Sequence, residues 1–198
     1  MESPYLNLAL LWILFYGVHS ILASSSIKSL VQNTLPAFNR PYRLLYNFIS
    51  ISLFVWAFAF QISMVERVFI DSLFLHYLGL TLVILSVYGM YLSFKNYQLQ
   101  EFIGIQQVRT NKHNAALSER LQTGGLNHYV RHPLYTASYL FFMAYLLYKP
   151  TLGSALFSLI SCIYLYLGAY WEEQKLIKQF GEEYKSYQKK VPMFIPKY

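Results

Sequence analysis

Long, uninterrupted apolar segments constrain this chain more than any other feature. Three of them, at roughly Tyr5–Ala23, Leu44–Met64 and Leu73–Phe94, come close to the ~20 residues that a helix needs to cross the hydrocarbon core of a bilayer. Only 13% of the residues are charged, against about 25% in soluble domains. Within lipid, a helix satisfies all of its backbone hydrogen bonds internally. The sequence therefore predicts an all-α integral membrane protein.

Two further apolar segments, Leu134–Tyr148 and Leu152–Tyr170, are separated by Lys149-Pro150-Thr151. Pro150 interrupts helical structure, so this pair is predicted to form a helical hairpin with a tight turn. In the tail that follows, apolar side chains recur at helical spacing between Lys and Glu, as in an amphipathic surface helix, with a break at Gly181. We expect about five transmembrane helices, of which the last two form the hairpin, and an amphipathic C-terminal helix.

The chain shows no internal repeat, so residues 1–198 are expected to form a single membrane-embedded domain. Its parts are three spans in residues 5–94, a hydrophilic loop over 95–133, the hairpin over 134–170 and a tail over 171–198. The hydrophilic loop has two interpretations. It is either an interfacial helix followed by a loop, or a lid over a cofactor site that begins at Pro133.

Basic residues fix the expected orientation. With the N-terminus outside, 14 of the 16 Lys and Arg residues fall on the inner side, and only Arg67 and Lys149 lie outside. Since basic residues concentrate in cytoplasmic loops, the hydrophilic loop, the C-terminus and any site at the hairpin ends are expected on the cytoplasmic side of the membrane, which is the inner membrane if the protein is bacterial. The N-terminal apolar segment lacks a preceding basic region, so it is interpreted as a retained span and not as a cleaved signal peptide.

Charge and cysteine content exclude several classes of function. The formal net charge is +7, but the basic residues lie in loops and form no continuous stripe, so we expect no nucleic-acid partner. Cys162 is the single cysteine, which excludes an intrachain disulfide and a cysteine metal cluster. No metal site is expected. The expected partners are the lipid bilayer and a small-molecule or lipophilic acceptor, and no pattern points to a particular oligomeric state.

The polar stretch from Gly124 to Tyr135 is the first candidate site. In it, Arg131-His132 directly precedes Pro133, whose fixed φ and missing N–H suit the first turn of a helix. Such a helix start offers unpaired N–H groups and the positive end of the helix dipole. With Arg131 beside it, this arrangement suits an anionic group such as a carboxylate. The alternative is that these residues only cap the helix.

Glu172-Glu173 is the second candidate. The two arms of the hairpin have nearly equal reach, about 26 and 28 Å at ~1.5 Å per residue, so Arg131, His132 and Glu172 are expected at the same level. Donors for a carboxylate on one side and an acceptor for an ammonium on the other match an amino-acid head group, and S-adenosylmethionine (SAM) carries one. The alternative is that both glutamates lie at a solvated helix end.

Two sets of residues carry a resemblance to known proteins. The first set is Arg131-His132-Pro133-Leu134-Tyr135, Glu172-Glu173, Phe180-Gly181-Glu182-Glu183-Tyr184, Tyr187 and Val191-Pro192 to Pro196. Over roughly residues 120–196, this set resembles the isoprenylcysteine carboxyl methyltransferase and phospholipid methyltransferase family of SAM-dependent membrane enzymes. The second set is His19-Ser20, Lys28, Arg43 to Asn47 and Phe102 to Val108. Through it, the N-terminal half is more loosely similar to the methanethiol S-methyltransferase and NnrU-like branch.

The resemblance implies roles for individual residues. His132 and Arg131 are the expected catalytic residues, and His132 is either a base or only a cofactor ligand. The residues expected to bind SAM are Glu119, Arg120, Leu121, Gln122, Arg131, His132, Pro133, Tyr135, Glu172 and Glu173. The chain departs from the family at Asn127, Ala137 and Gly168. Gly168 stands where prenylcysteine enzymes have a substrate-binding Arg, which argues against a prenylcysteine carboxylate as the substrate.

The resulting hypothesis is SAM-dependent S-methylation of a small or lipophilic thiol such as methanethiol. Alternatives are methylation of a prenylcysteine carboxylate or a lipid amine, an NADPH-dependent membrane reductase, and a non-catalytic membrane protein. Against a reductase, the chain lacks an obvious dinucleotide phosphate loop.

Overall fold

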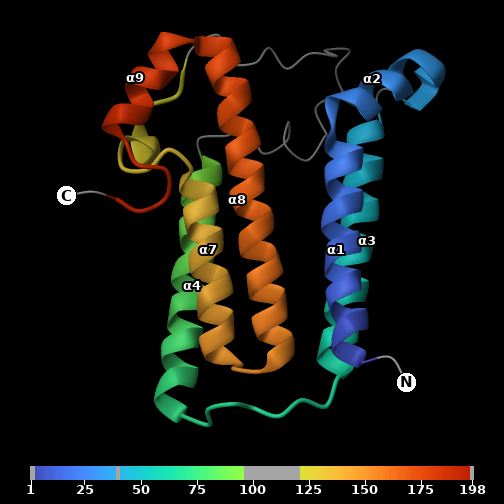
Figure 1. Cartoon of the computed structure of the whole chain (residues 1–198), viewed down its shortest axis with the longest axis vertical. Coiled ribbons are helices and arrows are strands. Elements are labelled where there is room, and N and C mark those ends of the chain that lie inside the picture. The colour runs from blue at the N-terminus through green and yellow to red at the C-terminus, as the bar shows by residue number, and fades with distance from the viewer. Residues whose placement is uncertain (1–2, 39–40, 96–120, 197–198) are drawn as a thin grey trace. The chain divides into compact units, whose positions relative to one another are not determined.

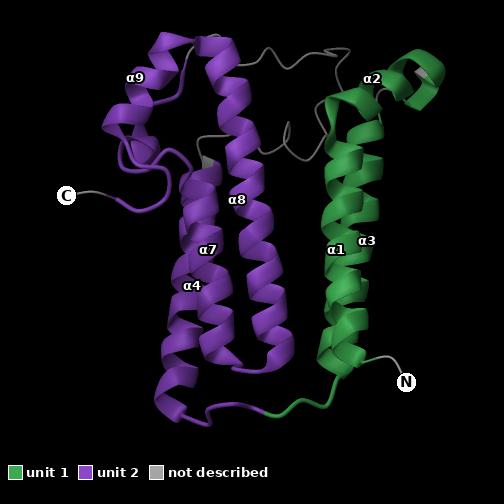
Figure 2. Cartoon of the chain, viewed as in Figure 1, with its two compact units in different colours: residues 1–67, 97–117 green, residues 68–96, 118–198 purple. Residues whose placement is uncertain are grey.

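The computed structural model describes residues 3–38, 41–95 and 121–196, and all regular structure within these ranges is helical (Figure 1). The chain divides into two compact units (Figure 2). Unit 1 contains the helices α1, α2, η1 and α3, and unit 2 contains α4, η2, α7, α8 and α9. The candidate site lies wholly within unit 2.

Unit 1 is built on the pair α1 (Pro4–Ala23) and α3 (Tyr42–Ser63). Between them come α2 (Ser25–Thr34) and the short 3-10 helix η1 (Pro36–Phe38). The hydroxyl of Tyr42 donates to the carbonyl of Leu22 at 2.8 Å, which ties the start of α3 to the end of α1. The two long helices therefore run antiparallel, as their apolar segments predict.

Two polar contacts hold α1 against α3. The indole N–H of Trp12 donates to Oε1 of Gln61 at 3.1 Å, and both side chains are almost fully buried. Further along the pair, Nδ1 of His19 lies 3.0 Å from the hydroxyl of Ser50. In an apolar environment such contacts bind neighbouring helices together and favour one register. His19 thus pairs with a neighbouring helix.

Unit 2 is built on α4 (Leu73–Lys95), α7 (Pro133–Tyr148) and α8 (Leu152–Phe180), with α7 packed against both of the others. The helices α7 and α8 form the predicted hairpin (Figure 1). At its turn, the hydroxyl of Thr151 accepts a hydrogen bond from the amide of Ser154 at 3.2 Å, which caps α8.

Close contact between the backbones of α4 and α7 depends on Gly79. A Cβ atom at this position would meet the amide nitrogen of Tyr148, and would lie 2.7 Å from the Cα of Tyr148 and 2.9 Å from the carbonyl oxygen of Ala144. All three are backbone atoms and cannot move aside as a flexible side chain would. Gly79 is therefore required for the observed packing, as small residues are at tight helix contacts in membranes.

We expect Gly79→Ala to lower the free energy of unfolding of unit 2 by about 1–3 kcal/mol, the usual cost of an overpacked contact. Thermal unfolding of the detergent-solubilised protein would measure the change. Gly17→Ala in α1 is the matched control, since a Cβ there meets no atom within 4 Å. Equal stability of the two variants would contradict the proposed role of Gly79.

Four helices in the described ranges are long and apolar enough to cross a membrane: α1, α3, α4 within Leu73–Phe94, and α8. The helix α7 has 16 residues and is shorter than these. The observed candidate spans are thus four, whereas the sequence pattern predicts about five.

The hairpin boundary expected at Tyr170 falls inside a helix, because α8 continues to Phe180. Residues 171–180 include no Gly or Pro, and most of them have high helix propensity, so nothing ends the helix there. The expected break occurs at Gly181, whose φ of 57° favours glycine. The separate helix α9 (Glu182–Lys190) follows, and its Tyr184 and Tyr187 are buried, so one face of this helix packs against the rest of unit 2.

Candidate active site at the hairpin ends

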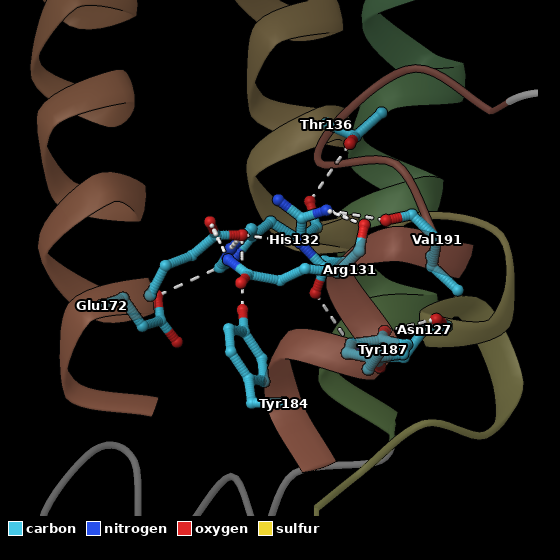
Figure 3. A network of polar contacts seen from close by, with 10 residues as sticks. Asn127, Arg131, His132, Thr136, Glu172, Tyr184, Tyr187 and Val191 are labelled. Carbon is cyan, nitrogen blue, oxygen red and sulfur yellow. Dashed lines mark hydrogen bonds and ion pairs between the residues drawn. The ribbon is translucent and has the colours of Figure 1, made fainter. Parts of the chain in front are cut away.

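Three segments of unit 2 meet at one end of the hairpin (Figure 3). The 3-10 helix η2 (Gly125–His128) leads through Arg131 and the N-cap residue His132 into α7. The last part of α8 carries Glu172 and Glu173. The third segment is α9 together with residues 191–194, which we call the C-terminal segment. The expected proximity of the two hairpin ends is therefore observed.

Glu173 is the centre of a buried polar network. Its Oε1 accepts from Nε of Arg131 at 2.6 Å and from the hydroxyl of Tyr184 at 3.3 Å, and it lies 3.2 Å from Nε2 of His132. Its Oε2 accepts from the side-chain amide of Gln188 at 2.8 Å. The side chains of Arg131 and Glu173 are each only 10% exposed. Arg131 and Glu173 thus form a buried ion pair whose carboxylate has several further partners.

The same arginine binds the C-terminal segment. Nη1 of Arg131 donates to the carbonyl oxygens of Gln188 at 3.2 Å and Val191 at 2.7 Å, and its backbone N–H donates to Pro192 at 2.9 Å. Two more donors at the start of α7 reach the next carbonyls: the amide of His132 donates to Met193 at 3.2 Å and the hydroxyl of Thr136 to Phe194 at 2.9 Å. The start of α7 is therefore fixed to the backbone after α9.

Glu172 has a different environment from Glu173. Its Oε2 lies 3.8 Å from Nδ1 of His132, and its side chain is 47% exposed, whereas the His132 side chain is 5% exposed. The imidazole stacks on the ring of Tyr135 with centroids 5.4 Å apart and also contacts Phe194. His132 therefore points Nε2 toward the buried ion pair of Arg131 and Glu173, and Nδ1 toward the accessible carboxylate of Glu172.

Tyr184 is a fixed hydrogen-bond donor in this network. Burial raises the pKa of its phenol, and the neighbouring carboxylate of Glu173 raises it further. The phenol therefore keeps its proton far above neutral pH and donates to Glu173 throughout the physiological range.

Asn127 braces the loop before α7. Its side-chain amide donates to the backbone carbonyl oxygen of Arg131 at 3.0 Å. The backbone carbonyl oxygen of Asn127 accepts from the hydroxyl of Tyr187 at 2.5 Å. Neither this role nor that of Gln188 was predicted from the sequence. The spacing of Tyr184 and Gln188 indicates that both face the same neighbour, because residues four apart lie on one face of a helix.

The remaining predicted residues have varied positions. Pro133 is the first residue of α7, and Tyr135 lies against His132. Leu121 and Gln122 precede η2, outside any helix. Glu119 and Arg120 lie outside the described residues. Gly168 is near the site, since a Cβ there would be 3.8 Å from the hydroxyl of Tyr135.

A cavity of about 920 Å³ borders the network. Val191 and Tyr187, which take part in the network, contribute to its wall, but His132 and Glu172 do not. The other lining residues are Leu121, Thr123, His128, Tyr129, Glu183, Ser186, Lys190, Pro192 and Pro196. In the part of the chain that the structure describes, no three His, Cys, Asp or Glu side chains are grouped as metal ligands.

The long apolar helices and the polar network at the hairpin ends define an integral membrane protein with a candidate active site at one end of its helices. The sequence model of the family described as "NnrU protein" matches residues 7–195. The chain belongs to this family, which confirms the resemblance to the NnrU-like branch. The wider resemblance to isoprenylcysteine carboxyl methyltransferases stays a prediction.

Individual relatives carry a consistent name. The chain is 31% identical to methanethiol S-methyltransferase 1 of Bradyrhizobium diazoefficiens, over 98% of this chain and 67% of that protein. It is 43% and 42% identical to the methanethiol S-methyltransferases of a Pseudomonas species and of Pseudomonas deceptionensis, in each case over 34% of this chain and 25% of the relative. No solved structure matches the chain.

Proposed function

We propose that this protein is a membrane methyltransferase that moves a methyl group from SAM to the sulfur of a small thiol such as methanethiol. The observation that carries the proposal is the similarity, over 98% of the chain, to a protein named methanethiol S-methyltransferase. No relative reported above favours a prenylcysteine carboxylate, a lipid amine, a reductase or a non-catalytic protein.

The donor set at the hairpin ends fits the amino-acid part of SAM. The half-exposed carboxylate of Glu172 is an acceptor for an ammonium group. For the carboxylate of SAM, the start of α7 at Pro133 offers the positive end of the helix dipole. Arg131 already donates to Glu173, Gln188 and Val191, so we propose that it holds the residues of this site in place. The segment Glu119 to Gln122 remains a predicted part of the cofactor site.

SAM supplies an electrophilic methyl group on a sulfonium. The thiol that accepts it must first lose its proton, because the thiolate is the nucleophile. We propose Nδ1 of His132 as the acceptor of this proton. With SAM bound, the thiolate sulfur would form a bond to the methyl carbon as the bond from that carbon to the sulfonium breaks, and the products would be a thioether and S-adenosylhomocysteine. The proton on His132 passes to water. Charge is neutralised in this displacement, so alignment in surroundings of low polarity favours it.

The proposed placement follows the distribution of basic residues, with the N-terminus outside and the site in the cytoplasm. We also propose that α7 is a fifth span. Its 16 residues extend about 24 Å at ~1.5 Å per residue, and it packs between α4 and α8, both long enough to cross a bilayer. We also propose that the two units belong to one membrane-embedded domain.

The proposal is tested by incubating the purified protein in nanodiscs with methyl-labelled SAM and each of three acceptors: methanethiol, a prenylcysteine and phosphatidylethanolamine. We expect label in dimethyl sulfide, and none with empty nanodiscs. Label that appears only in the lipid amine or only in the prenylcysteine ester would overturn the thiol assignment.

A further inference from the structure

We infer that Glu173 is a positioning residue that holds the proton of neutral His132 on Nε2, which leaves Nδ1 as the base that takes the proton of the thiol. The inference rests on the proposed function for the identity of the substrate. The position of the proton rests on the structure alone.

The partners of Glu173 determine its ionisation. Arg131 is a permanent cation whose Nε can only donate, and it is 2.6 Å from Oε1. The phenol of Tyr184 donates to the same oxygen, and the amide of Gln188 donates to the other oxygen. A carboxylate surrounded by donors and paired with a guanidinium is ionised and can only accept. Nε2 of His132, at 3.2 Å, must therefore carry a hydrogen.

Packing prevents the ring of His132 from reversing this arrangement. The residue is 6% exposed, and its ring lies against both Tyr135 and Phe194. Its backbone N–H is bound to the carbonyl of Met193 at 3.2 Å. A ring held in this way keeps Nε2 toward Glu173 and Nδ1 toward Glu172.

The gap between Nδ1 of His132 and Glu172 suits a hydrogen donor. Nδ1 of the neutral ring and the carboxylate are both acceptors, and their separation of 3.8 Å is longer than a hydrogen bond. A thiol S–H that enters this space gives Nδ1 a proton to accept. The imidazolium formed then lies between two carboxylates, Glu173 on one side and Glu172 on the other, and both stabilise its charge.

The step is balanced without a further reagent. The S–H bond of the thiol breaks and its proton forms a bond to Nδ1, while the sulfur keeps the electron pair with which it attacks the methyl carbon. The charged groups that face the ring are Glu172 and Glu173 from α8 and, through Glu173, Arg131 from the loop before α7. Tyr184 reaches the same carboxylate from α9.

The test compares Glu173→Gln with the unchanged protein on two thiols of similar size, ethanethiol and the much more acidic 2,2,2-trifluoroethanethiol. The glutamine side chain keeps an oxygen that accepts from Arg131 and His132, but it lacks the negative charge of Glu173 beside the His132 ring. We expect kcat for ethanethiol to fall by about 100-fold or more, in the range of general-base catalysis. For the thiol that is already ionised at the assay pH, a smaller loss of less than about 10-fold is expected.

Further measurements separate positioning from other roles. In Glu173→Gln the Kd for S-adenosylhomocysteine should stay within about threefold. Glu182→Gln is the matched control and should leave both thiols unaffected, since Glu182 has an 82% exposed side chain. Equal losses on the two thiols, or a large change in the Kd, would overturn the inference.

Nitrogen NMR of histidine-labelled protein tests the proton position without any activity. The signal of His132 is assigned by its loss in His132→Gln. A protonated Nε2 with a bare Nδ1 supports the inference, and the opposite tautomer overturns it. Methylation of neither thiol by the unchanged protein would overturn the proposed function and the role of Nδ1 as its base, whereas the tautomer would still report whether Glu173 positions the ring.

Discussion

Arg131→Ala is expected to lower the free energy of unfolding of unit 2 by about 3–5 kcal/mol, because removal of one partner leaves the carboxylate of Glu173 buried and unpaired. The same change removes the donors that Gln188 and Val191 accept from, so the C-terminal segment should also become more open to proteases. Denaturant unfolding in detergent and limited proteolysis would measure the two effects.

The double variant Arg131→Met with Glu173→Leu tests the reason for this loss. Without either charge the cost of desolvating a buried charge disappears, so the double variant should be more stable than Arg131→Ala alone. The effects of the two substitutions on the free energy of unfolding should therefore not be additive. Arg67→Ala removes an exposed arginine of unit 1 and serves as the matched control. A loss of less than about 1 kcal/mol for Arg131→Ala would show that the ion pair does not hold unit 2 together.

Glu172→Gln is expected to weaken binding of S-adenosylhomocysteine by roughly 10- to 100-fold. A hydrogen bond to a charged group contributes about 1.5–3 kcal/mol, and each 1.4 kcal/mol is about tenfold in affinity. Stability should hardly change, since the Glu172 side chain is 47% exposed and is 3.8 Å from His132. Isothermal titration calorimetry measures the affinity.

Glu183→Gln is the matched comparison for this prediction, because Glu183 lines the cavity of about 920 Å³ and Glu172 does not. If Glu183→Gln weakens binding and Glu172→Gln does not, the cofactor binds in that cavity and the proposed site at Glu172 is wrong. The pair of variants thus decides between two locations in unit 2.

The sequence predicted the long helices well because each depends on a local property. The apolar segments of α1, α3 and α4 are continuous, and the turn at Lys149 to Thr151 contains a proline that ends helical structure. The extension of α8 to Phe180 was missed, since its polar residues suggested a separate surface helix. Continuity of the backbone across a change in polarity is decided by helix propensity, which the apolar pattern does not report.

For the candidate site, the sequence predicted which residues meet but not how they pair. Equal hairpin arms place Glu172 and Glu173 at the level of His132, but adjacent residues on a helix point about 100° apart. The rotation of α8 about its axis turns Glu173 inward and leaves Glu172 accessible, and this rotation is set by packing along the whole helix. The contacts of Arg131 with residues 188 to 192 depend on the turn at Gly181, which the sequence pattern marks without giving its direction.

The residues at the start of α7 bind the C-terminal segment through the backbone carbonyl oxygens of that segment. Arg131, His132 and Thr136 donate to carbonyl oxygens at four successive positions, from Val191 to Phe194. Every amino acid has such an oxygen, so a position such as Met193 is free to vary in side chain as long as the number of residues is kept. Deletion or insertion of a single residue there would move each carbonyl away from its donor, which makes this stretch tolerant of substitution and intolerant of any change in length.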